Sequence, residues 1–240
     1  MTFKSTGLWI LSILTALIAV VVVDRQSGST LRLGNRMFHS MWTYLGPVMD
    51  ECLAPTKAPL LSLAQGKVVE IGPGHGSNFK YFAKNKVTSL IAVEPNTLMH
   101  PKLVEQAKEY GLDQFEIVGA MWENSNLEEG SCDAIISNLV LCSVDNLYHT
   151  LDLVHKYLKP GGKFIFIEHV GHPNGTMWRT MQNLVTPLWK YVGDNCHLNR
   201  DVAPALAAMD GWKDVELKVG DMCGSFPLVN PKIYGYATKV

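Results

Sequence analysis

Residues Val68–Asn78 read VVEIGPGHGSN, a short apolar segment that carries one acid and continues into glycines at alternate positions. The run Val68–Ile71 predicts a buried parallel strand, and Gly72, Gly74 and Gly76 predict a sharp turn after it. Glycine has no Cβ, so at a strand-to-helix junction a ligand can lie directly against the backbone N–H groups. The stretch therefore predicts a binding site for a nucleotide-type cofactor.

The spacing of the glycines distinguishes between cofactors. A dinucleotide fingerprint, G-x-G-x-x-G, would need glycine at the position of Ser77, which disfavours a nicotinamide oxidoreductase. Glu70 repels phosphate and favours a cationic ligand. An acid followed by G-x-G-x-G resembles motif I of the class I S-adenosylmethionine (AdoMet)-dependent methyltransferases. This resemblance implies that Glu70 lies near the amino acid end of AdoMet, and a tight turn without a ligand is the alternative.

Further candidate cofactor residues follow the later strands. The expected second strand, Ser89–Val93, ends before Glu94, which is placed to accept hydrogen bonds from both ribose hydroxyls, with Asn96 assisting. Among class I methyltransferases the turn after the third strand, here Phe115–Val118, lines the adenine. The resemblance therefore implies adenine contacts in that turn, and local packing of the tryptophan is the alternative; the residues concerned are Met121, Trp122 and Glu123.

The fourth expected strand, Cys132–Ser137, ends before Asn138. At the carboxyl end of a parallel strand this side chain can reach either the methionine part of AdoMet or the methyl acceptor. The following residues, Leu139–Cys142, are expected to pack in the protein interior.

The remaining pattern predicts the fold. Helices are expected over Asn78–Lys84, Pro101–Tyr110 and Leu147–Leu158, and a fifth strand over Lys163–Ile167 after the LKPGG sequence typical of these methyltransferases. Strands at Val215–Val219 and Tyr234–Thr238 resemble the antiparallel ending of the methyltransferase sheet. The expected fold is α/β: a doubly wound, Rossmann-like, seven-stranded sheet with an antiparallel last strand, plus an N-terminal transmembrane helix.

The N-terminal segment Gly7–Val23 contains seventeen residues without a charge. As a helix it would be about 25 Å long, enough to span a thin bilayer. Arginines follow it at positions 25, 32 and 36, so its C-terminal side is expected to face the cytosol. The alternatives are a cleaved signal peptide and a buried core helix. We therefore expect a membrane anchor over residues 1–24, a linker and cap helix over 25–66 and the methyltransferase domain over 67–240.

The segment Leu31–Pro59 has an apolar face at helical spacing and is expected to be interrupted or ended at Gly46 and Pro47. It could lie on the membrane, cap an active site or pack against the domain.

Composition excludes some partners. The 240 residues carry a net charge of -1 and no basic field, so no nucleic-acid partner is indicated. The five cysteines are odd in number and lack a C-x-x-C pair, which favours a reduced compartment.

The residues after the expected fifth strand resemble one particular group of these methyltransferases. They contain EHV at Glu168–Val170, PLW at Pro187–Trp189 and G-D-x-C-x-L-x-R over Gly193–Arg200. Together with the apolar N-terminus, they resemble the membrane-associated methyltransferase-like proteins that include thiol S-methyltransferases of the endoplasmic reticulum and lipid droplets. The resemblance implies a membrane-bound enzyme, in the endoplasmic reticulum with its domain in the cytosol, that methylates a small apolar acceptor, a thiol first. An N- or O-methyltransferase and a non-catalytic AdoMet-binding assembly factor are the alternatives.

Methyl transfer from a sulfonium needs alignment and desolvation, and no metal is expected. A thiol acceptor must lose its proton, so a base would help. The candidate catalytic residues are His169, Asp194 and His197. Glu168 is a further candidate, Asp194 and Arg200 could instead form an ion pair, and Cys196 could line the pocket. Aromatic residues of the same insertion, Trp178, Trp189 and Tyr191, are expected to build an apolar lid.

Overall fold

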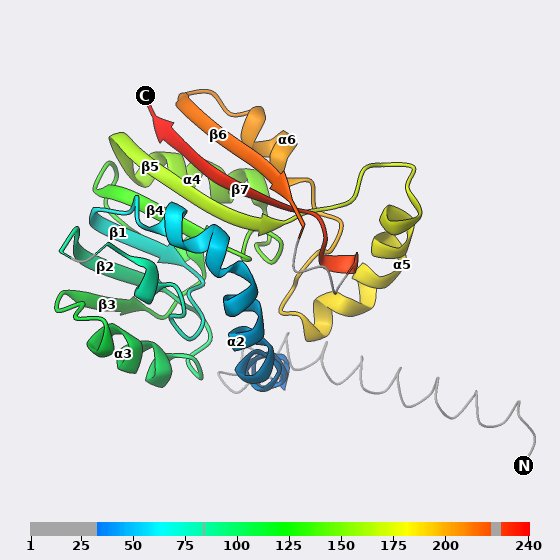
Figure 1. Cartoon of the computed structure of the whole chain (residues 1–240), viewed down its shortest axis with the longest axis horizontal. Coiled ribbons are helices and arrows are strands. Elements are labelled where there is room, and N and C mark those ends of the chain that lie inside the picture. The colour runs from blue at the N-terminus through cyan, green and yellow to red at the C-terminus, as the bar shows by residue number, and fades with distance from the viewer. Residues whose placement is uncertain (1–32, 84, 222–226) are drawn as a thin grey trace, which may run out of the picture.

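The computed structural model describes residues 33–83, 85–221 and 227–240 of the chain. These residues build a seven-stranded sheet with the strand order β3-β2-β1-β4-β5-β7-β6 (Figure 1). The strands are β1 Gly66–Ile71, β2 Val87–Val93, β3 Phe115–Val118, β4 Cys132–Asn138, β5 Leu158–His169, β6 Trp212–Gly220 and β7 Lys232–Lys239.

The first five strands run parallel, whereas β7 pairs antiparallel with both β5 and β6. This confirms the predicted Rossmann-like sheet with its antiparallel ending. The chain reverses its direction of travel across the sheet between β1 and β4, and ligands of open α/β sheets bind outside the carboxyl ends of the strands at such a point. The residues that end β1, β2, β4 and β5 are therefore brought to one edge.

Helices cover both faces of the sheet. They are α2 Leu33–Leu61, α3 His100–Glu109, α4 Leu147–Tyr157, α5 Met177–Val192 and α6 Val202–Ala207, with short 3-10 turns at Phe79–Tyr81, Trp122–Asn124 and Pro227–Val229. The central strands are apolar on both sides because both faces are buried. One face packs with α2 and α3, and the other packs with α4 and α6.

The α2 helix differs from the expectation at Gly46 and Pro47. It continues through Pro47 and two further prolines to Leu61, and Figure 1 shows that it changes direction along its length. Prolines inside a helix remove backbone hydrogen bonds and bend it. Burial of Leu53 and Leu61 against the sheet offsets this loss.

A buried ion pair also holds α2. Lys57 Nζ lies 2.7 Å from Asp50 Oδ1, and Lys80 contacts the other carboxylate oxygen. Burial alone would raise the pKa of Asp50, but the hydrogen bonds from both lysines outweigh it and lower the pKa. The C-terminal half of α2 is therefore fixed to the segment that follows the glycine turn.

Three other local expectations are wrong. The sequence predicts a helix over residues 78–84, but of the described residues 78–83 only Phe79–Tyr81 form a single turn, because Phe79 and Phe82 both pack into the core. The LKPGG sequence does not precede β5 but lies within it, since β5 begins at Leu158. Cys52 is disulfide-bonded, so the expectation of reduced cysteines is wrong there, whereas Cys132, Cys142 and Cys196 are free.

The predicted membrane span, Gly7–Val23, lies outside the described residues. Among the helices from residue 33 onward, none is long and apolar enough to cross a membrane.

Candidate cofactor and active site

The glycine turn follows β1 as the sequence predicts. Gly72, Gly74 and Gly76 have φ values of 57°, 58° and 79°, in the left-handed region that favours glycine. A Cβ on Gly72 would lie 2.8 Å from a Val140 methyl group. The backbone conformation and the close neighbour therefore both require glycine at this position.

Glu70 lies in the buried part of β1, one residue before the strand ends, and within the described chain only one of its carboxylate oxygens has a hydrogen-bond partner. Asn78 Nδ2 donates to Oε1, while Oε2 is buried without a hydrogen bond. Asn138, at the end of the neighbouring strand β4, donates from Nδ2 to Asn78 Oδ1, and its own Oδ1 is also buried and unpaired. Two unpaired acceptors in one network match an ammonium group, which has three donors. The residues present therefore fit the amino acid part of AdoMet.

Burial dominates the electrostatics of Glu70. It raises the pKa from 4.5 to about 7, although the hydrogen bond from Asn78 and the charge of Lys57 act in the opposite direction. A buried carboxylate without full compensation is unstable, and a cationic ligand would stabilise its ionised form.

Glu94 follows β2 and holds the glycine turn. Its Oε2 accepts a 2.9 Å hydrogen bond from the backbone N–H of Gly74, and its Oε1 accepts one of 2.8 Å from that of Asn96. Burial, with a smaller contribution from the charge of nearby Asp194, raises the pKa of Glu94 to about 7, against the hydrogen bonds from Asn96 and Gly74 that lower it. Each carboxylate oxygen retains a second lone pair, so ribose hydroxyls could still donate to Glu94.

The N-terminal half of α2 lies against these residues. Asn96 Nδ2 donates to the backbone oxygen of Asn35, and His39 Nδ1 lies 3.4 Å from His75 Nε2. A Cβ on Gly74 would meet Trp42 Nε1 at 3.2 Å. The predicted cap helix therefore contacts the glycine turn directly.

The three residues predicted to contact the adenine, all in the turn after β3, have different surroundings in the structure. Trp122 is buried in the core, where its indole N–H donates to Thr150 O and its ring packs edge-on against Tyr157. Glu123 accepts a hydrogen bond from Thr150 Oγ1, and Met121 is exposed. The Trp122 side chain is therefore part of the core, and Met121 is the most exposed of the three predicted adenine contacts.

At the end of β5, Glu168 supports the backbone. It accepts hydrogen bonds from Ser137 Oγ and from the backbone N–H groups of Val140 and Leu141. Burial raises its pKa to about 7, against these hydrogen bonds. With both oxygens engaged, Glu168 orders the loop after β4.

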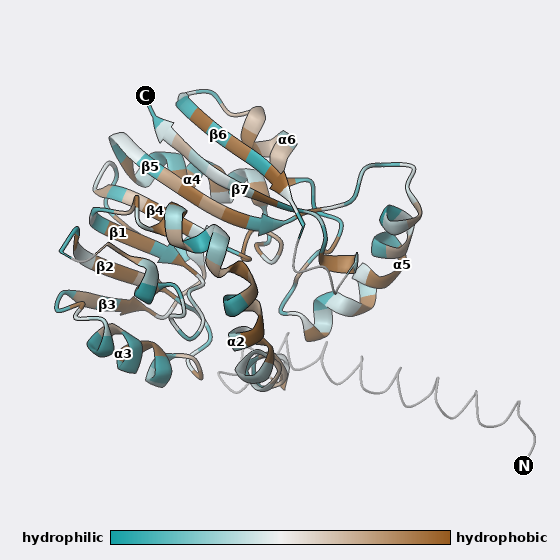
Figure 2. Cartoon of the chain, in the orientation of Figure 1, coloured by the Kyte–Doolittle hydropathy of each residue, from teal (hydrophilic) through white to brown (hydrophobic). Residues whose placement is uncertain are grey.

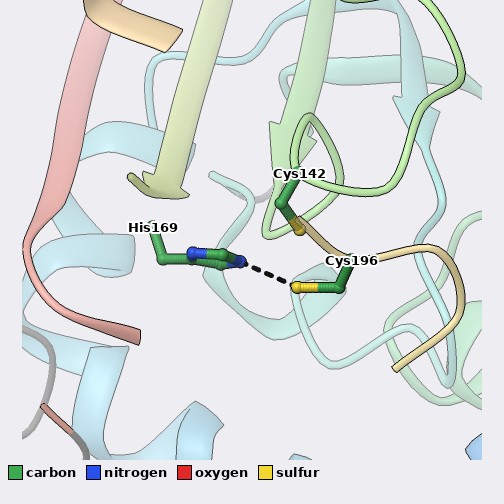
Figure 3. Close-up of side chains that lie close together, drawn as sticks. All are labelled: Cys142, His169 and Cys196. Carbon is green, nitrogen blue, oxygen red and sulfur yellow. Dashed lines mark hydrogen bonds between the residues drawn. The ribbon is translucent and has the colours of Figure 1, made fainter. Parts of the chain in front are cut away.

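His169 contacts two cysteines. Its Nε2 lies 3.1 Å from Cys196 Sγ, and Cys142 completes the cluster (Figure 3). The three residues are buried, with 4%, 8% and 2% of their surfaces exposed in the order His169, Cys196, Cys142. The sequence pointed to His169 and Cys196 individually but not to their meeting with Cys142.

The other two predicted catalytic residues lie in the loop after α5. Asp194 is close enough to Glu94 to raise its pKa. His197 Nδ1 lies 3.1 Å from Arg200 Nη2, and burial followed by the Arg200 charge lowers the His197 pKa. Arg200 also donates to the carbonyl oxygen of Leu141, so it braces the loop that carries Cys142.

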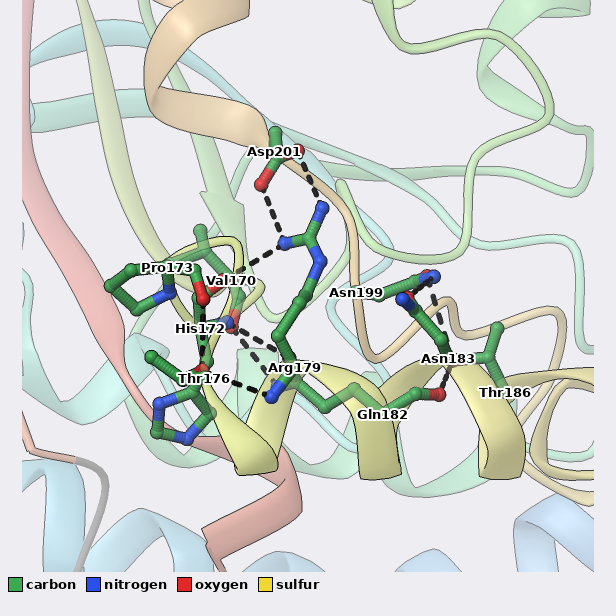
Figure 4. Close-up of polar contacts among 10 residues, drawn as sticks. All are labelled: Val170, His172, Pro173, Thr176, Arg179, Gln182, Asn183, Thr186, Asn199 and Asp201. Carbon is green, nitrogen blue, oxygen red and sulfur yellow. Dashed lines mark hydrogen bonds and ion pairs between the residues drawn. The ribbon is translucent and has the colours of Figure 1, made fainter.

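A polar network fixes the insertion that contains α5 (Figure 4). The buried Gln182 donates to the carbonyl oxygens of Leu228 and Asn230, and its Oε1 accepts from the backbone N–H of His172. Arg179 forms a bidentate ion pair with Asp201. Of the expected lid aromatics, Trp189 packs beside Cys142 and Cys196, whereas Trp178 is partly exposed.

Comparisons with known proteins agree with this geometry. The family model described as "Methyltransferase domain" matches residues 69–166. The chain is 34% identical over 203 residues to the human thiol S-methyltransferase TMT1A, covering 80% of this chain and 82% of that protein. It is 36% identical over 152 residues to TMT1B of Rattus norvegicus, where the match spans 62% of this chain and 57% of the relative.

A solved structure shares the fold. Geranyl diphosphate C-methyltransferase from Streptomyces coelicolor A3(2), in complex with Mg2+, geranyl diphosphate and S-adenosyl-L-homocysteine, superposes with a TM-score of 0.58 at 15% sequence identity. The superposition covers 79% of this chain and 77% of that one. At this identity the likeness is one of fold.

Proposed function

The chain belongs to the AdoMet-dependent methyltransferase family that contains human TMT1A, and from this we propose that it is a membrane-anchored enzyme that methylates the sulfur of a small apolar thiol. AdoMet is its cofactor. The residues that would hold it are the glycine turn, Glu70 with Asn138 at the amino acid end and Glu94 at the ribose. AdoMet supplies an activated methyl group, so the protein's task is to align the acceptor and exclude water.

The observation that carries the thiol proposal is the apolar wall beside His169. Cys142, Cys196 and Leu198 form a buried cluster, and the side chains packed against it are Val185, Trp189, Leu228 and Val229. Such surroundings favour an uncharged, apolar acceptor over a charged one, because burial of a charge is costly. The relatives' names, which state thiol methylation, support sulfur as the acceptor atom.

The membrane proposal is supported by an exposed apolar stripe on α5. Met177, Met181, Leu184 and Leu188 recur at helical spacing and are 69%, 40%, 67% and 59% exposed. The neighbouring α2, which contacts α5, exposes further apolar side chains at Met37, Tyr44, Leu45 and Val48, and Figure 2 shows apolar residues on both helices. Amphipathic helices of this kind lie in the membrane interface. With Gly7–Val23 as the anchor, the arginines that follow it favour the cytosolic side of the endoplasmic reticulum for the domain, a compartment in which the disulfide at Cys52 is uncommon.

The activity test uses the full chain in a nonionic detergent with methyl-labelled AdoMet. An alkyl thiol, the alcohol of the same carbon skeleton and the corresponding amine are offered at equal concentration. Label in the thioether alone supports the proposal. Label in the alcohol or amine product, or binding of S-adenosylhomocysteine without label in any product, refutes thiol methylation.

The membrane test compares two full-length chains in cells. The wild type should stay in the membrane pellet after alkaline carbonate extraction, and a variant with Leu14→Lys and Leu17→Lys should leave it. A wild-type chain that is extracted would refute the anchor. If the double variant stays in the pellet, Leu184→Lys and Leu188→Lys are added to the same chain. Extraction of that variant would show that the apolar stripe on α5 is enough to keep the protein bound to the membrane.

A further inference from the structure

Three side chains that commonly bind metal ions meet at the carboxyl end of the sheet. Cys142 comes from the loop after β4, His169 ends β5, and Cys196 comes from the loop after α5. Their ligand atoms, two Sγ and one imidazole nitrogen, all lie within 4.8 Å of one another. Figure 3 shows the imidazole and the two sulfur atoms turned toward one another.

The donor set selects the kind of ion. Thiolate and imidazole favour zinc, whereas magnesium and calcium require oxygen ligands. Zinc binds sulfur at about 2.3 Å and nitrogen at about 2.0 Å, which places ligand atoms of a tetrahedral site roughly 3.5 to 4 Å apart. Since the three donors already lie within 4.8 Å, small side-chain rotations are enough to bring them to that geometry.

The charges around the cluster favour a divalent ion. Two cysteine thiolates and one Zn²⁺ sum to zero when the imidazole is neutral, so the buried centre carries no net charge. Next to it, the Glu168 carboxylate and the Arg200 guanidinium have opposite charges and are each hydrogen-bonded to the loop after β4. A monovalent ion would leave one buried negative charge before any acceptor binds, which is costly. With Zn²⁺ the centre becomes negative only when the acceptor thiolate binds, and the positive charge of the AdoMet sulfonium then offsets it.

No competing bond holds the imidazole away from the thiols. The second ring nitrogen of His169, Nδ1, is buried and has no hydrogen-bond partner in the described chain. Nε2 lies 3.1 Å from Cys196 Sγ, which leaves Nδ1 to carry the proton that a metal-bound imidazole retains.

We propose that Cys142, His169 and Cys196 bind one Zn²⁺, and that the fourth position of this ion takes the sulfur of the acceptor thiol. Three protein ligands with one open position are typical of catalytic rather than structural zinc. Cys142 lies four residues after Asn138, which belongs to the cofactor network, so the site lies close to the cofactor. The second half of the proposal rests on the proposed thiol substrate, whereas the first half does not.

The ion would lower the pKa of the bound acceptor thiol, so that a side-chain base is not required for its deprotonation. On coordination the S–H bond of the acceptor breaks, a Zn–S bond forms and the proton passes to solvent. When the acceptor sulfur gains the methyl group, the C–S bond of the sulfonium breaks and S-adenosylhomocysteine leaves. The methylated product is a neutral thioether, a weaker ligand than a thiolate, so it dissociates and reopens the position.

The zinc content of the purified protein tests the first half of the proposal, that the cluster binds Zn²⁺. The full chain, produced with zinc and purified in detergent, should retain one equivalent of zinc by elemental analysis, and Cys142→Ser and Cys196→Ser should each lose most of it. Cys132→Ser is the matched control, because Cys132 is also buried and free but begins β4 instead of following it. A wild-type chain without zinc after reduction and zinc titration, or an equal loss in Cys132→Ser, overturns the proposal.

If a serine variant does not fold, the wild-type protein alone can still test whether the cluster binds a metal ion. Metal-stripped, reduced wild-type protein should take up one equivalent of Co²⁺ and acquire the near-ultraviolet absorption of cobalt–thiolate bonds. Absence of this absorption overturns the site. A disulfide between Cys142 and Cys196 that forms in place of zinc binding after reduction also overturns it.

The same cobalt protein tests the fourth position without any turnover. Addition of the acceptor thiol should change the cobalt spectrum, whereas the alcohol of the same skeleton should not. If the spectrum does not change but the thiol is methylated, the acceptor sulfur does not bind the ion, and that half of the proposal is overturned. Thiol methylation itself would then still stand. A thiol-dependent change without methyl transfer would support the site and refute the proposed function, so the two failures are distinguishable.

Discussion

Replacing Glu70 by glutamine should make the cofactor-free protein more stable above neutral pH while weakening the binding of S-adenosylhomocysteine. Glutamine is nearly isosteric with glutamate and carries no charge. Burial raises the pKa of Glu70 from 4.5 to about 7 in the folded chain. At 1.36 kcal/mol per pKa unit, ionised Glu70 costs about 3 kcal/mol of folding free energy.

The sign of the pH dependence follows from the raised pKa. Below pH 4.5 the carboxyl is protonated in both the folded and unfolded chains, so the penalty is absent. Between pH 4.5 and about 7 the folded chain binds more protons than the unfolded one, and the free energy of unfolding falls as pH rises. The stability gain of Glu70→Gln should therefore be small near pH 5 and approach about 3 kcal/mol near pH 8.5.

Urea unfolding of the detergent-solubilised full chain, followed by tryptophan fluorescence, measures this gain at both pH values. Glu116→Gln, an exposed residue on β3, is the control and should show no pH-dependent gain. Equal unfolding free energies of wild type and Glu70→Gln near pH 8.5 would refute the buried, uncompensated carboxylate.

Binding measurements complete the test. Loss of a charge-assisted hydrogen bond to the ammonium group should weaken S-adenosylhomocysteine binding roughly 10- to 100-fold. Binding of 5′-methylthioadenosine, which lacks the amino acid part, should not change. An equal loss for both ligands would contradict the assignment of Glu70 to the amino acid end.

Three further variants test the glycine turn, the ribose site and the insertion. Gly74→Val should weaken S-adenosylhomocysteine binding at least about tenfold in calorimetry, because it adds left-handed strain and a contact with Trp42; Gly111→Val, with a φ of 69° and open space around its Cβ, carries the strain alone and should bind normally. Glu94→Gln should weaken binding of S-adenosylhomocysteine and methylthioadenosine alike, by about tenfold, and unchanged affinity would remove Glu94 from the ribose site. Gln182→Leu should lower the free energy of unfolding by at least about 2 kcal/mol, since it leaves buried carbonyl oxygens without donors; Thr180→Ala, exposed on the same helix, should cost less than half as much in the same urea experiment.

The sequence predicted what depends on local pattern. Buried strands with β-branched residues gave the positions of β1, β2 and β4, and the glycines after β1 predicted the left-handed turn that the structure contains. Side chains that end parallel strands share one edge by topology alone, so the proximity of Glu70, Glu94 and Asn138 followed from the strand assignments. The assignment of these residues to particular parts of AdoMet is still a prediction.

Local pattern failed where tertiary packing outweighs propensity. Gly46 and Pro47 predict a break in a helix, yet α2 continues to Leu61 because its second half is buried and tied through Lys57 to Asp50. The segment after the glycine turn has helical composition but forms a single turn, because its phenylalanines pack into the core. In both segments the deciding contacts are with residues that are distant in the sequence.

The Cys142, His169 and Cys196 cluster shows the same limit at the active site. Each residue stands 27 positions from the next, a spacing that matches no short metal motif, and a lone buried cysteine is more often a core residue than a ligand. Only the adjacency of β4 and β5, together with the fixing of α5 by Gln182 and of the following loop by Arg200, brings the three donors together. If the cluster binds zinc, the base expected for thiol methylation need not be a side chain. The rate at saturating thiol should then depend on the bound ion more than on His197 or Asp194, and replacement of zinc by cobalt should change it while His197→Gln leaves it within about threefold.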